Sequence, residues 1–162
     1  MITISEMTYE DIPIVSRIER ICFGNKWTPT SFQKELENPN CFYFVAKKDS
    51  IIGYTGYWLI LEEVHITSVA VLPKYRRNKI SQQLLLYLIN HSLERQSKWI
   101  TLEVKESNIP AIKLYEKFGF KVMGKRKNYY QKDNEDALIM WTDNIREENY
   151  INRLIKLQQE IS

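Results

Sequence analysis

The sequence has few of the residues that mark disulfide-bonded, metal-binding or membrane proteins. It contains two cysteines and two histidines in 162 residues. Cys22 and Cys41 have neither metal-ligand nor redox spacing, so we expect reduced packing residues, no metal, and a reducing compartment such as the cytoplasm or an organelle stroma. Apolar runs such as residues 84–89 are far shorter than the roughly 20 residues of a membrane-spanning helix. The acidic N-terminal region has no signal pattern, so we expect no membrane partner.

An excess of charge of one sign is also missing. The net charge is +3, which is too small to predict direct nucleic-acid binding. With 44% hydrophobic and 27% charged residues, the chain has the composition of an ordinary globular protein. Repeats and low-complexity segments are absent. One domain is therefore expected.

Hydrophobic periodicity and turn residues predict alternating strands and helices, an α/β (α+β) fold. Strands are expected at residues 2–6, 41–47, 51–59, 63–71, 99–104, 121–129 and 137–141, and helices from Thr8 to Gly24, from Thr28 to about Asn38, over 80–95 and from Asn108 to Phe118. The order strand, helix, strand over residues 63–104 predicts a right-handed crossover, and hence a parallel or mixed sheet.

The tail, residues 144–162, has apolar residues at helical steps. We expect an amphipathic helix that packs on, or extends from, a domain of residues 1–143. The face predicted for burial consists of Ile151, Leu154, Ile155, Gln158 and Ile161.

A basic loop precedes the helix predicted at residues 80–95. Four cations lie within six residues, Lys74 to Lys79. Unpaired N–H groups and the dipole at a helix N-terminus attract anions, so this loop is a candidate cradle for a phosphate or pyrophosphate. A solvated basic loop is the alternative.

A carboxylate, an amide and a phenol follow one another across the next strand-to-helix junction. Glu103 lies near the end of a strand, Asn108 is in the N-cap position, and Tyr115 lies on the helix that Gly119 ends. A base and an acid on neighbouring rigid elements can act on one substrate, although a surface glutamate and a packed tyrosine are the alternative. His65 is a rival base, since histidine titrates nearest neutrality, but a histidine early in a strand more often packs or hydrogen-bonds.

Five motifs in order at compatible spacings carry a resemblance to a known family. They are His65–Val71, residues 102–108, Leu114–Phe120, Asn128–Tyr130 and residues 135–140. With them, from about Ile2 to Trp141, the chain resembles the GNAT N-acetyltransferases. Within that family it is similar to the RimI type, which acetylates the N-terminal alanine of a ribosomal protein.

The resemblance implies a fold and an activity. The GNAT acyl-CoA N-acyltransferase fold has a central mixed β-sheet, splayed in the middle and flanked by helices, with acetyl-CoA in the wedge between the strands ending at Val71 and Val104. The implied activity is direct transfer of acetyl from acetyl-CoA to the α-amine of a protein N-terminus, such as an alanine of a small-subunit ribosomal protein.

The resemblance also implies roles for individual residues. Glu103 corresponds to the general base and Tyr115 to the general acid. Coenzyme binding falls to Val69, Ala70, Val71, Arg76, Arg77, Asn78, Lys79, Ile80, Ser81 and Asn108. Trp27, Tyr129 and Tyr130 are expected to flank an extended peptide, although these aromatic residues are equally compatible with core packing.

The basic loop departs from the family pattern. Lys79 stands where the family has a glycine, and Ser81 replaces another small residue. Lys79 either crowds the pyrophosphate or adds a phosphate contact, with Asn78 absorbing any strained turn. Two other interpretations therefore stay open: a GNAT-fold interaction module with impaired acetyl-CoA binding, and a small-amine or lysine acetyltransferase.

Overall fold

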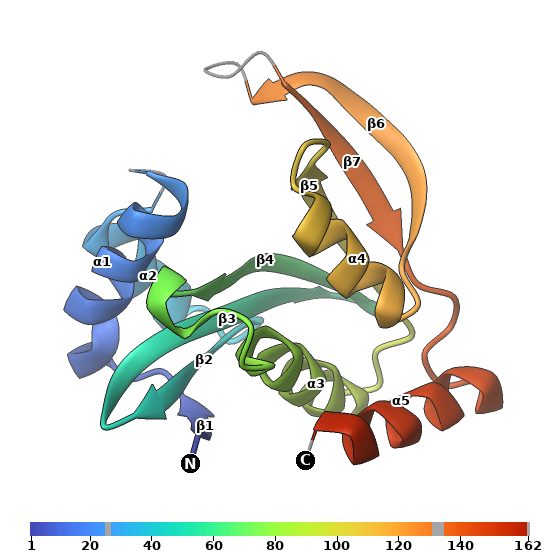
Figure 1. The fold of residues 1–162 in the computed structure, drawn as a ribbon, viewed down its shortest axis with the longest axis horizontal. Helices are drawn as coiled ribbons and strands as arrows, with labels where there is room; N and C mark the ends of the chain where they lie inside the picture. The colour runs from blue at the N-terminus through green and yellow to red at the C-terminus, as the bar shows by residue number, and fades with distance from the viewer. Residues whose placement is uncertain (25–26, 131–134, 162) are drawn as a thin grey trace.

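The computed structural model describes residues 1–24, 27–130 and 135–161, with the side chains of Asn128 and Tyr130 left aside. The strands are β1 (Thr3–Glu6), β2 (Cys41–Lys48), β3 (Ser50–Ile60), β4 (Glu63–Val71), β5 (Trp99–Lys105), β6 (Lys121–Tyr130) and β7 (Glu135–Trp141). The helices are α1 (Ile12–Phe23), α2 (Pro29–Glu37), α3 (Ile80–Leu93), α4 (Ile109–Lys117) and α5 (Glu148–Ile161), with short 3-10 turns η1 (Tyr9–Asp11) and η2 (Pro73–Tyr75). Figure 1 shows their arrangement.

The described strands form one seven-stranded sheet in the order β1-β2-β3-β4-β5-β7-β6. β4 and β5 run parallel, joined by the α3 crossover, and the other neighbours are antiparallel. The prediction of a mixed sheet flanked by helices is therefore confirmed.

Local signals explain several element boundaries. The Thr28 hydroxyl accepts a hydrogen bond from the Ser31 N–H at 3.2 Å, and Pro29 fills the first helical position of α2. Gly119, with φ of +88°, takes the left-handed conformation that ends α4. A side chain at Gly119 would also meet the Tyr150 ring at 3.0 Å. These residues set the ends of the helices beside the predicted site.

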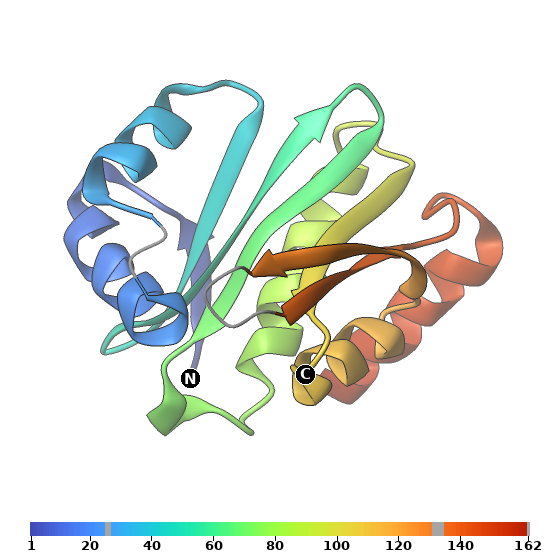
Figure 2. The same cartoon turned by 90° about the horizontal axis from the view of Figure 1, so that it is seen from above.

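β4 and β5 separate because β4 carries a β-bulge. The parallel pairing stops at His65 and Thr101. On the other edge of β4, Ile66 pairs with Tyr57 and Ser68 pairs with Gly56, which leaves Thr67 as an extra residue. A bulge bends its strand, so β4 turns away from β5 beyond this point (Figure 2). The splayed wedge that the family resemblance implies is thus present.

The two faces of the sheet are covered by different helices. Along β4, Ala70 lies in a hydrophobic cluster with residues of α1 and α2, whereas its neighbour Val71 packs with Ile80 and Leu84 of α3. The cluster on the α3 side extends to α4 and α5. The face opposite α3 is thus the one that α1 and α2 share with the β6–β7 hairpin (Figure 1).

The tail forms α5 and packs on the α3 side of the sheet, and the residues predicted for its buried face are partly wrong. The helix buries Tyr150, Leu154, Leu157 and Ile161, while Ile155 is 53% exposed. The observed stripe follows steps of four, three and four residues. The Tyr150 hydroxyl donates to the Phe118 carbonyl at 2.7 Å, which orients this face. In the described part of the chain, no helix is both long and apolar enough to cross a membrane.

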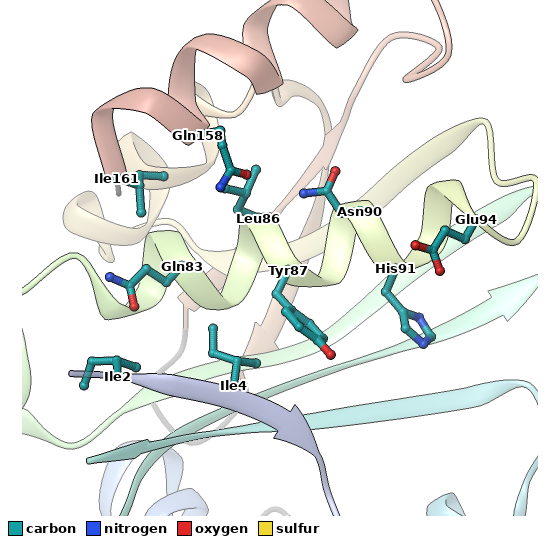
Figure 3. A pocket seen from close by; sticks show the side chains of 10 residues that line it. All are labelled: Ile2, Ile4, Gln83, Leu86, Tyr87, Asn90, His91, Glu94, Gln158 and Ile161. Atoms are coloured by element: carbon teal, nitrogen blue, oxygen red, sulfur yellow. The ribbon is translucent and has the colours of Figure 1, made fainter.

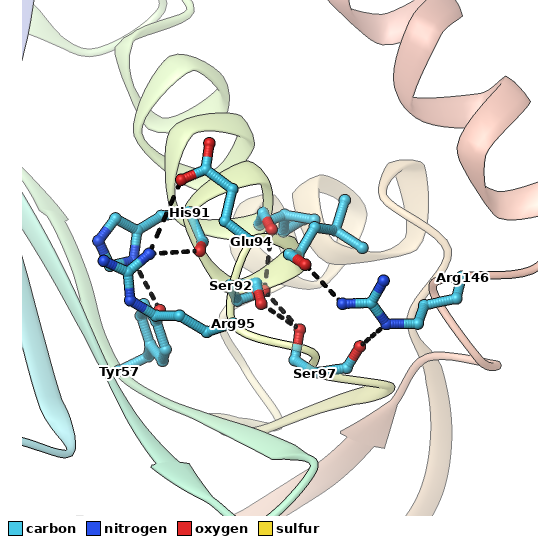
Figure 4. Close-up of polar contacts among 9 residues, drawn as sticks. Tyr57, His91, Ser92, Glu94, Arg95, Ser97 and Arg146 are labelled. Carbon is cyan, nitrogen blue, oxygen red and sulfur yellow. Dashed lines mark hydrogen bonds and ion pairs between the residues drawn. The ribbon is translucent and has the colours of Figure 1, made fainter.

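A half-buried histidine of α3, His91, packs against the sheet. The Nδ1 atom of His91 lies 2.7 Å from the Tyr57 hydroxyl, and Figure 4 draws this contact. The rings of Phe44 and Phe42 lie 4.7 and 5.0 Å from its ring. Burial first, and then the charge of Arg95, lower the pKa of His91 to about 4. The imidazole is therefore neutral at physiological pH.

This pKa predicts how stability depends on pH. Because unfolded histidine titrates near pH 6.5, the unfolded chain binds the extra proton first as the pH falls. The contribution of His91 is complete above about pH 6.5 and is lost as the pH approaches about 4, by roughly 1 kcal/mol after allowance for solvent screening. Urea unfolding of wild type and His91→Gln across this range measures it. The slope should persist in His65→Gln, and an equal slope in His91→Gln would contradict the assignment.

Candidate active site

Glu103 lies near the end of β5, at the place where β4 has turned away. Its neighbours Leu102 and Val104 point into the α3-side core, so Glu103 points to the opposite face. Its Oε1 lies 3.2 Å from Arg126 Nη2, and 27% of the side chain is exposed. The other oxygen, Oε2, is buried, and no described side chain or backbone group hydrogen-bonds to it. A buried carboxylate oxygen without a donor is an acceptor that a ligand can use.

Tyr115 approaches β5 from the other face. It projects from α4 into the α3-side core, where it is 8% exposed, and its ring packs against Phe120 at 5.7 Å. Glu103 and Tyr115 therefore flank β5 from opposite sides. One edge of β5 is paired with β7 from Thr101 to Lys105. Within the described residues, the edge that faces β4, which is unpaired beyond Thr101, is the one open to a molecule reaching both side chains.

The peptide groups of β4 supply donors along that open edge. Leu72 N–H donates to Ile52 O at 2.9 Å, and bonded and non-bonded pairs alternate in an antiparallel ladder. The N–H groups of Val69 and Val71 therefore point away from β3, toward the wedge, while those of Ala70 point to β3. The side chain of Ala70 is buried among residues of α1 and α2. Val69 and Val71, rather than Ala70, can thus bond a ligand between β4 and β5.

The basic loop, which begins within η2, has the backbone shape of a glycine-rich loop. Arg77 and Lys79 both have left-handed conformations, with φ of +69° and +62°. The expectation that Asn78 absorbs the strained turn is therefore wrong. Asn78 instead donates from Nδ2 to the Tyr75 carbonyl at 3.2 Å. The first helical bond of α3 runs from Gln83 N–H to Lys79 O, so the N–H groups of Ile80 and Ser81 lie in the unsatisfied first turn.

Two of the loop cations hold the protein together. Arg76 Nε donates to Val71 O at 3.1 Å, which ties the loop to the end of β4. Lys79 Nζ donates to the carbonyl of Glu160 at 3.0 Å, at the C-terminal end of α5. A cation there also favours the helix dipole. The loop thus offers its backbone N–H groups to an anion while these side chains brace it.

The residues expected to flank a peptide lie on two different elements: Trp27 precedes α2, and Tyr129 lies on β6. Trp27 is half-buried, with its ring 5.5 Å from Phe32 and 6.4 Å from Tyr43. Tyr129 is 42% exposed, and the Arg126 guanidinium lies 5.5 Å from its ring. Tyr129 is therefore linked through Arg126 to Glu103. The side chain of Tyr130 lies outside the described part of the structure.

Asn108 caps the helix that carries Tyr115. Its Oδ1 accepts the Ala111 N–H at 3.3 Å, as expected for an N-cap residue. The side-chain Nδ2 is then the group that can contact a coenzyme.

A family model described as the acetyltransferase (GNAT) family matches residues 12–120. The chain belongs to the GNAT family. A Bacillus subtilis protein, provisionally named as a ribosomal protein bS18-alanine N-acetyltransferase, is 41% identical over 85% of this chain and 93% of its own length. The Escherichia coli crystal structure of the ribosomal-protein-S18-alanine N-acetyltransferase is 30% identical, with a TM-score of 0.82 over 92% of this chain and 98% of that one. A GNAT acetyltransferase of Elizabethkingia anophelis with acetyl-CoA bound is 22% identical and has the same fold, with a TM-score of 0.74 over 88% and 97%.

This GNAT acetyltransferase also contains site residues that sequence reasoning missed. On α2, Glu35 accepts hydrogen bonds from the Tyr43 hydroxyl at 2.7 Å and from the Trp58 indole. The bulge residue Thr67 donates to the Tyr43 hydroxyl at 3.1 Å. Burial and then the bond to Glu35 raise the pKa of Tyr43, so its hydroxyl stays protonated. The sequence feature that could have identified Glu35 is its position three residues after Phe32, which puts a carboxylate on the buried side of α2.

Arg126 is the second missed residue. The sequence predicts that Arg126 lies on the strand 121–129. It does not predict a contact with Glu103, because β7 lies between β5 and β6 in the sheet. The structure shows that the Arg126 side chain extends over β7 to the Glu103 carboxylate. This side chain connects Tyr129, which is expected to flank a peptide, to the predicted base.

A cavity of about 500 Å³ lies elsewhere, along α3 between β1 and α5 (Figure 3). Ile2, Ile4, Tyr87, His91 and Ile161 are among the residues that line it. Its lining includes none of the predicted site residues of this GNAT protein. It therefore plays no part in the site around Glu103.

Substitutions at Lys79 separate backbone strain from coenzyme contact. Glycine and alanine both remove the ammonium, but only glycine relieves the left-handed backbone. We expect Lys79→Gly to unfold with a free energy about 1 kcal/mol higher than Lys79→Ala. Since Lys79 Nζ lies on Glu160, the Kd for acetyl-CoA should change by less than about threefold in either variant. Denaturation and calorimetry measure both. A change in Kd of about tenfold would instead place the lysine at the coenzyme.

Proposed function

We propose that this acetyltransferase transfers acetyl from acetyl-CoA to the α-amine of a protein N-terminus. The observation that carries the proposal is the buried Oε2 of Glu103, which has no described donor and lies at the open edge of β5 with Tyr115 on the far side. The names of the Bacillus subtilis and Escherichia coli relatives support the alanine end of ribosomal protein bS18 as acceptor. Such an acceptor places the enzyme in the cytoplasm or an equivalent reducing compartment, which the free thiols of Cys22 and Cys41 support.

Acetyl-CoA fits the donors on β4 and α3. The N–H groups of Val69 and Val71 can pair with the amides of the pantetheine arm. The first-turn N–H groups of Ile80 and Ser81, with the α3 dipole, suit the pyrophosphate, and the Lys79 side chain bonds the Glu160 carbonyl instead. The acetyl-CoA held by the Elizabethkingia anophelis relative supports this donor.

The arrangement supports direct transfer. An α-amine has a pKa near 8 and is mostly protonated at neutral pH, so it must lose a proton before it attacks. Glu103 Oε2 accepts that proton, directly or through water. The nitrogen then forms a bond to the thioester carbon, and a backbone N–H near Val71 that is not paired with the pantetheine arm donates to the carbonyl oxygen as negative charge develops there. The carbon–sulfur bond breaks, and the Tyr115 phenol protonates the departing thiolate.

Peptide acetylation tests the proposal. The full-length protein is incubated with acetyl-CoA and an alanine-ended peptide that also contains one lysine, and the modified nitrogen is located by mass spectrometry. Acetyl on the α-amine supports the proposal. A matched peptide with a formylated N-terminus should remain unmodified. Acetylation of the lysine alone, or no product beside an active relative, would sink it.

A further inference from the structure

A second cavity, of about 640 Å³, lies beside the turn between β3 and β4, near the start of β4. It is lined by Glu35, Asn38, Asn40, Cys41, Trp58, Leu59, Ile60 and Leu61. They come from residues 35–41, which run from the end of α2 to the start of β2, and from residues 58–61, at the end of β3 and in the turn that follows. The cavity is therefore formed by two segments that are separate in sequence.

The cavity combines one carboxylate with an apolar wall. Glu35 is fixed by the Tyr43 hydroxyl, the Trp58 indole and, at 3.7 Å, the Cys41 thiol. These partners are neutral donors, and among the described residues no lysine or arginine pairs with Glu35. Trp58 and Ile60 are 37% and 50% exposed. An aromatic ring and aliphatic surface beside an unneutralised carboxylate suit a long cationic side chain, because its stem packs while its charge meets the acid.

The two ends of β4 differ in charge. The end that leads through η2 to α3 carries the basic loop, Lys74 to Lys79. The other end carries the Glu35 cavity and Glu63, whose carboxylate lies 3.3 Å from His65. Figure 2 shows η2 and the β3–β4 turn at opposite ends of the strand. The phosphates of acetyl-CoA suit the basic end of β4. The acidic end is therefore left for the acceptor.

Strand spacing sets which acceptor residue reaches the cavity. Trp58 on β3 lies opposite His65 on β4, which in turn pairs with Thr101 on β5, two residues before Glu103. Two strand spacings, about 10 Å, combined at right angles with the two-residue offset along β5, about 7 Å, give about 12 Å, or between three and four residues of extended peptide. An acceptor whose α-amine is at Glu103 thus brings about its fourth residue to Trp58.

We propose that the Glu35 cavity binds a lysine or arginine side chain at about the fourth residue of the acceptor peptide. The inference rests on the proposed N-terminal acetylation and names a class of acceptor: protein N-termini with an early basic residue. Glu35 is a specificity residue that lowers KM and leaves the chemical step at Glu103 unchanged.

Peptide pairs test this subsite with the intact protein. Alanine-ended peptides carry arginine at the third, fourth or fifth residue, and each is matched with a peptide that has citrulline, which is uncharged and of similar shape, at the same place. We expect arginine to lower KM by about tenfold at one position at least, with kcat changed by less than about twofold. In Glu35→Gln the KM values for the arginine and citrulline peptides should become equal, and a thermal unfolding curve like that of wild type shows that the variant is folded.

Glu37→Gln is the matched control, because Glu37 lies on the same helix, is exposed and does not line the cavity. It should keep the full arginine preference. Equal KM values for arginine and citrulline peptides at all three positions, or a preference that survives in Glu35→Gln, would overturn the subsite alone. Failure to acetylate the α-amine of any peptide would instead overturn the proposed function, and the subsite with it.

Discussion

Replacing Glu103 by glutamine is expected to lower kcat by about 100-fold or more while the Kd for acetyl-CoA stays within about twofold. Glutamine keeps the size of the side chain and can still accept a hydrogen bond, but it cannot take a proton from the ammonium group of the acceptor. Turnover then depends on amine that is already deprotonated in solution. Because an α-amine has a pKa near 8, the apparent pH optimum should also rise.

The chain offers a close control for this variant. Glu106 is paired with Lys125 at 2.7 Å, much as Glu103 is paired with Arg126, and both partners lie on β6. Glu106→Gln therefore removes a carboxylate and an ion pair from the same region, yet it should retain full activity. If Glu103→Gln lost acetyl-CoA binding on calorimetry, or kept a kcat within about threefold of wild type, Glu103 would not be the base.

Elements defined by local chemistry were predictable from the sequence. The pair Thr28 and Pro29 begins α2, Gly119 ends α4, and β4 spans the predicted residues 63–71. Each of these depends on a cap, a turn or a β-rich run that neighbouring residues set. The parallel pairing of β4 with β5 also followed, because a strand, a helix and a strand in that order leave few other arrangements.

The splay of the sheet has no such local marker. Thr67 is an ordinary strand residue in sequence, and it becomes the bulge only because Ile66 and Ser68 pair with adjacent residues of β3. A register between segments about ten residues apart depends on packing along both strands. The sequence therefore indicated the wedge through family resemblance alone.

The charges of the basic loop show a related limit. Counting cations predicted a cradle for phosphate, but it did not show where each side chain goes. Arg76 bonds the end of β4, and Lys79 bonds the end of α5, which is 81 residues away in sequence. The positive φ at Lys79 shows that the backbone keeps the glycine-like shape although the residue has changed.

The helix at the C-terminus was predicted with its buried face rotated by about one residue. Ile151 and Ile155 are the more hydrophobic choices, but Tyr150 and Leu157 are buried instead. The decisive contact is the bond from the Tyr150 hydroxyl to the Phe118 carbonyl, at the end of α4. Periodicity alone shows which faces of a helix are apolar. A hydrogen bond to another element, here from Tyr150 to Phe118, determines which of these faces is buried.

Replacing Tyr115 by phenylalanine should lower kcat by about tenfold to 100-fold, with little change in KM for either substrate. The ring that packs against Phe120 is kept, and only the hydroxyl that would protonate the thiolate is lost. A thiolate leaving without a proton donor makes breakage of the carbon–sulfur bond the harder step. Steady-state kinetics with acetyl-CoA and an alanine-ended peptide measure the effect, and an unchanged Kd for acetyl-CoA shows that the wedge is intact.

Tyr87→Phe provides the comparison, because Tyr87 is a tyrosine of α3 that lines the cavity of Figure 3 and is remote from the predicted base. Its kcat should stay within about twofold of wild type. If Tyr115→Phe behaves in the same way, the proton comes from solvent. Glu103 would then act alone, and burying a phenol on the far side of β5 would serve packing only. A large loss confined to Tyr115 requires the thioester to lie at the open edge of β5, because no other position reaches side chains on both faces of that strand.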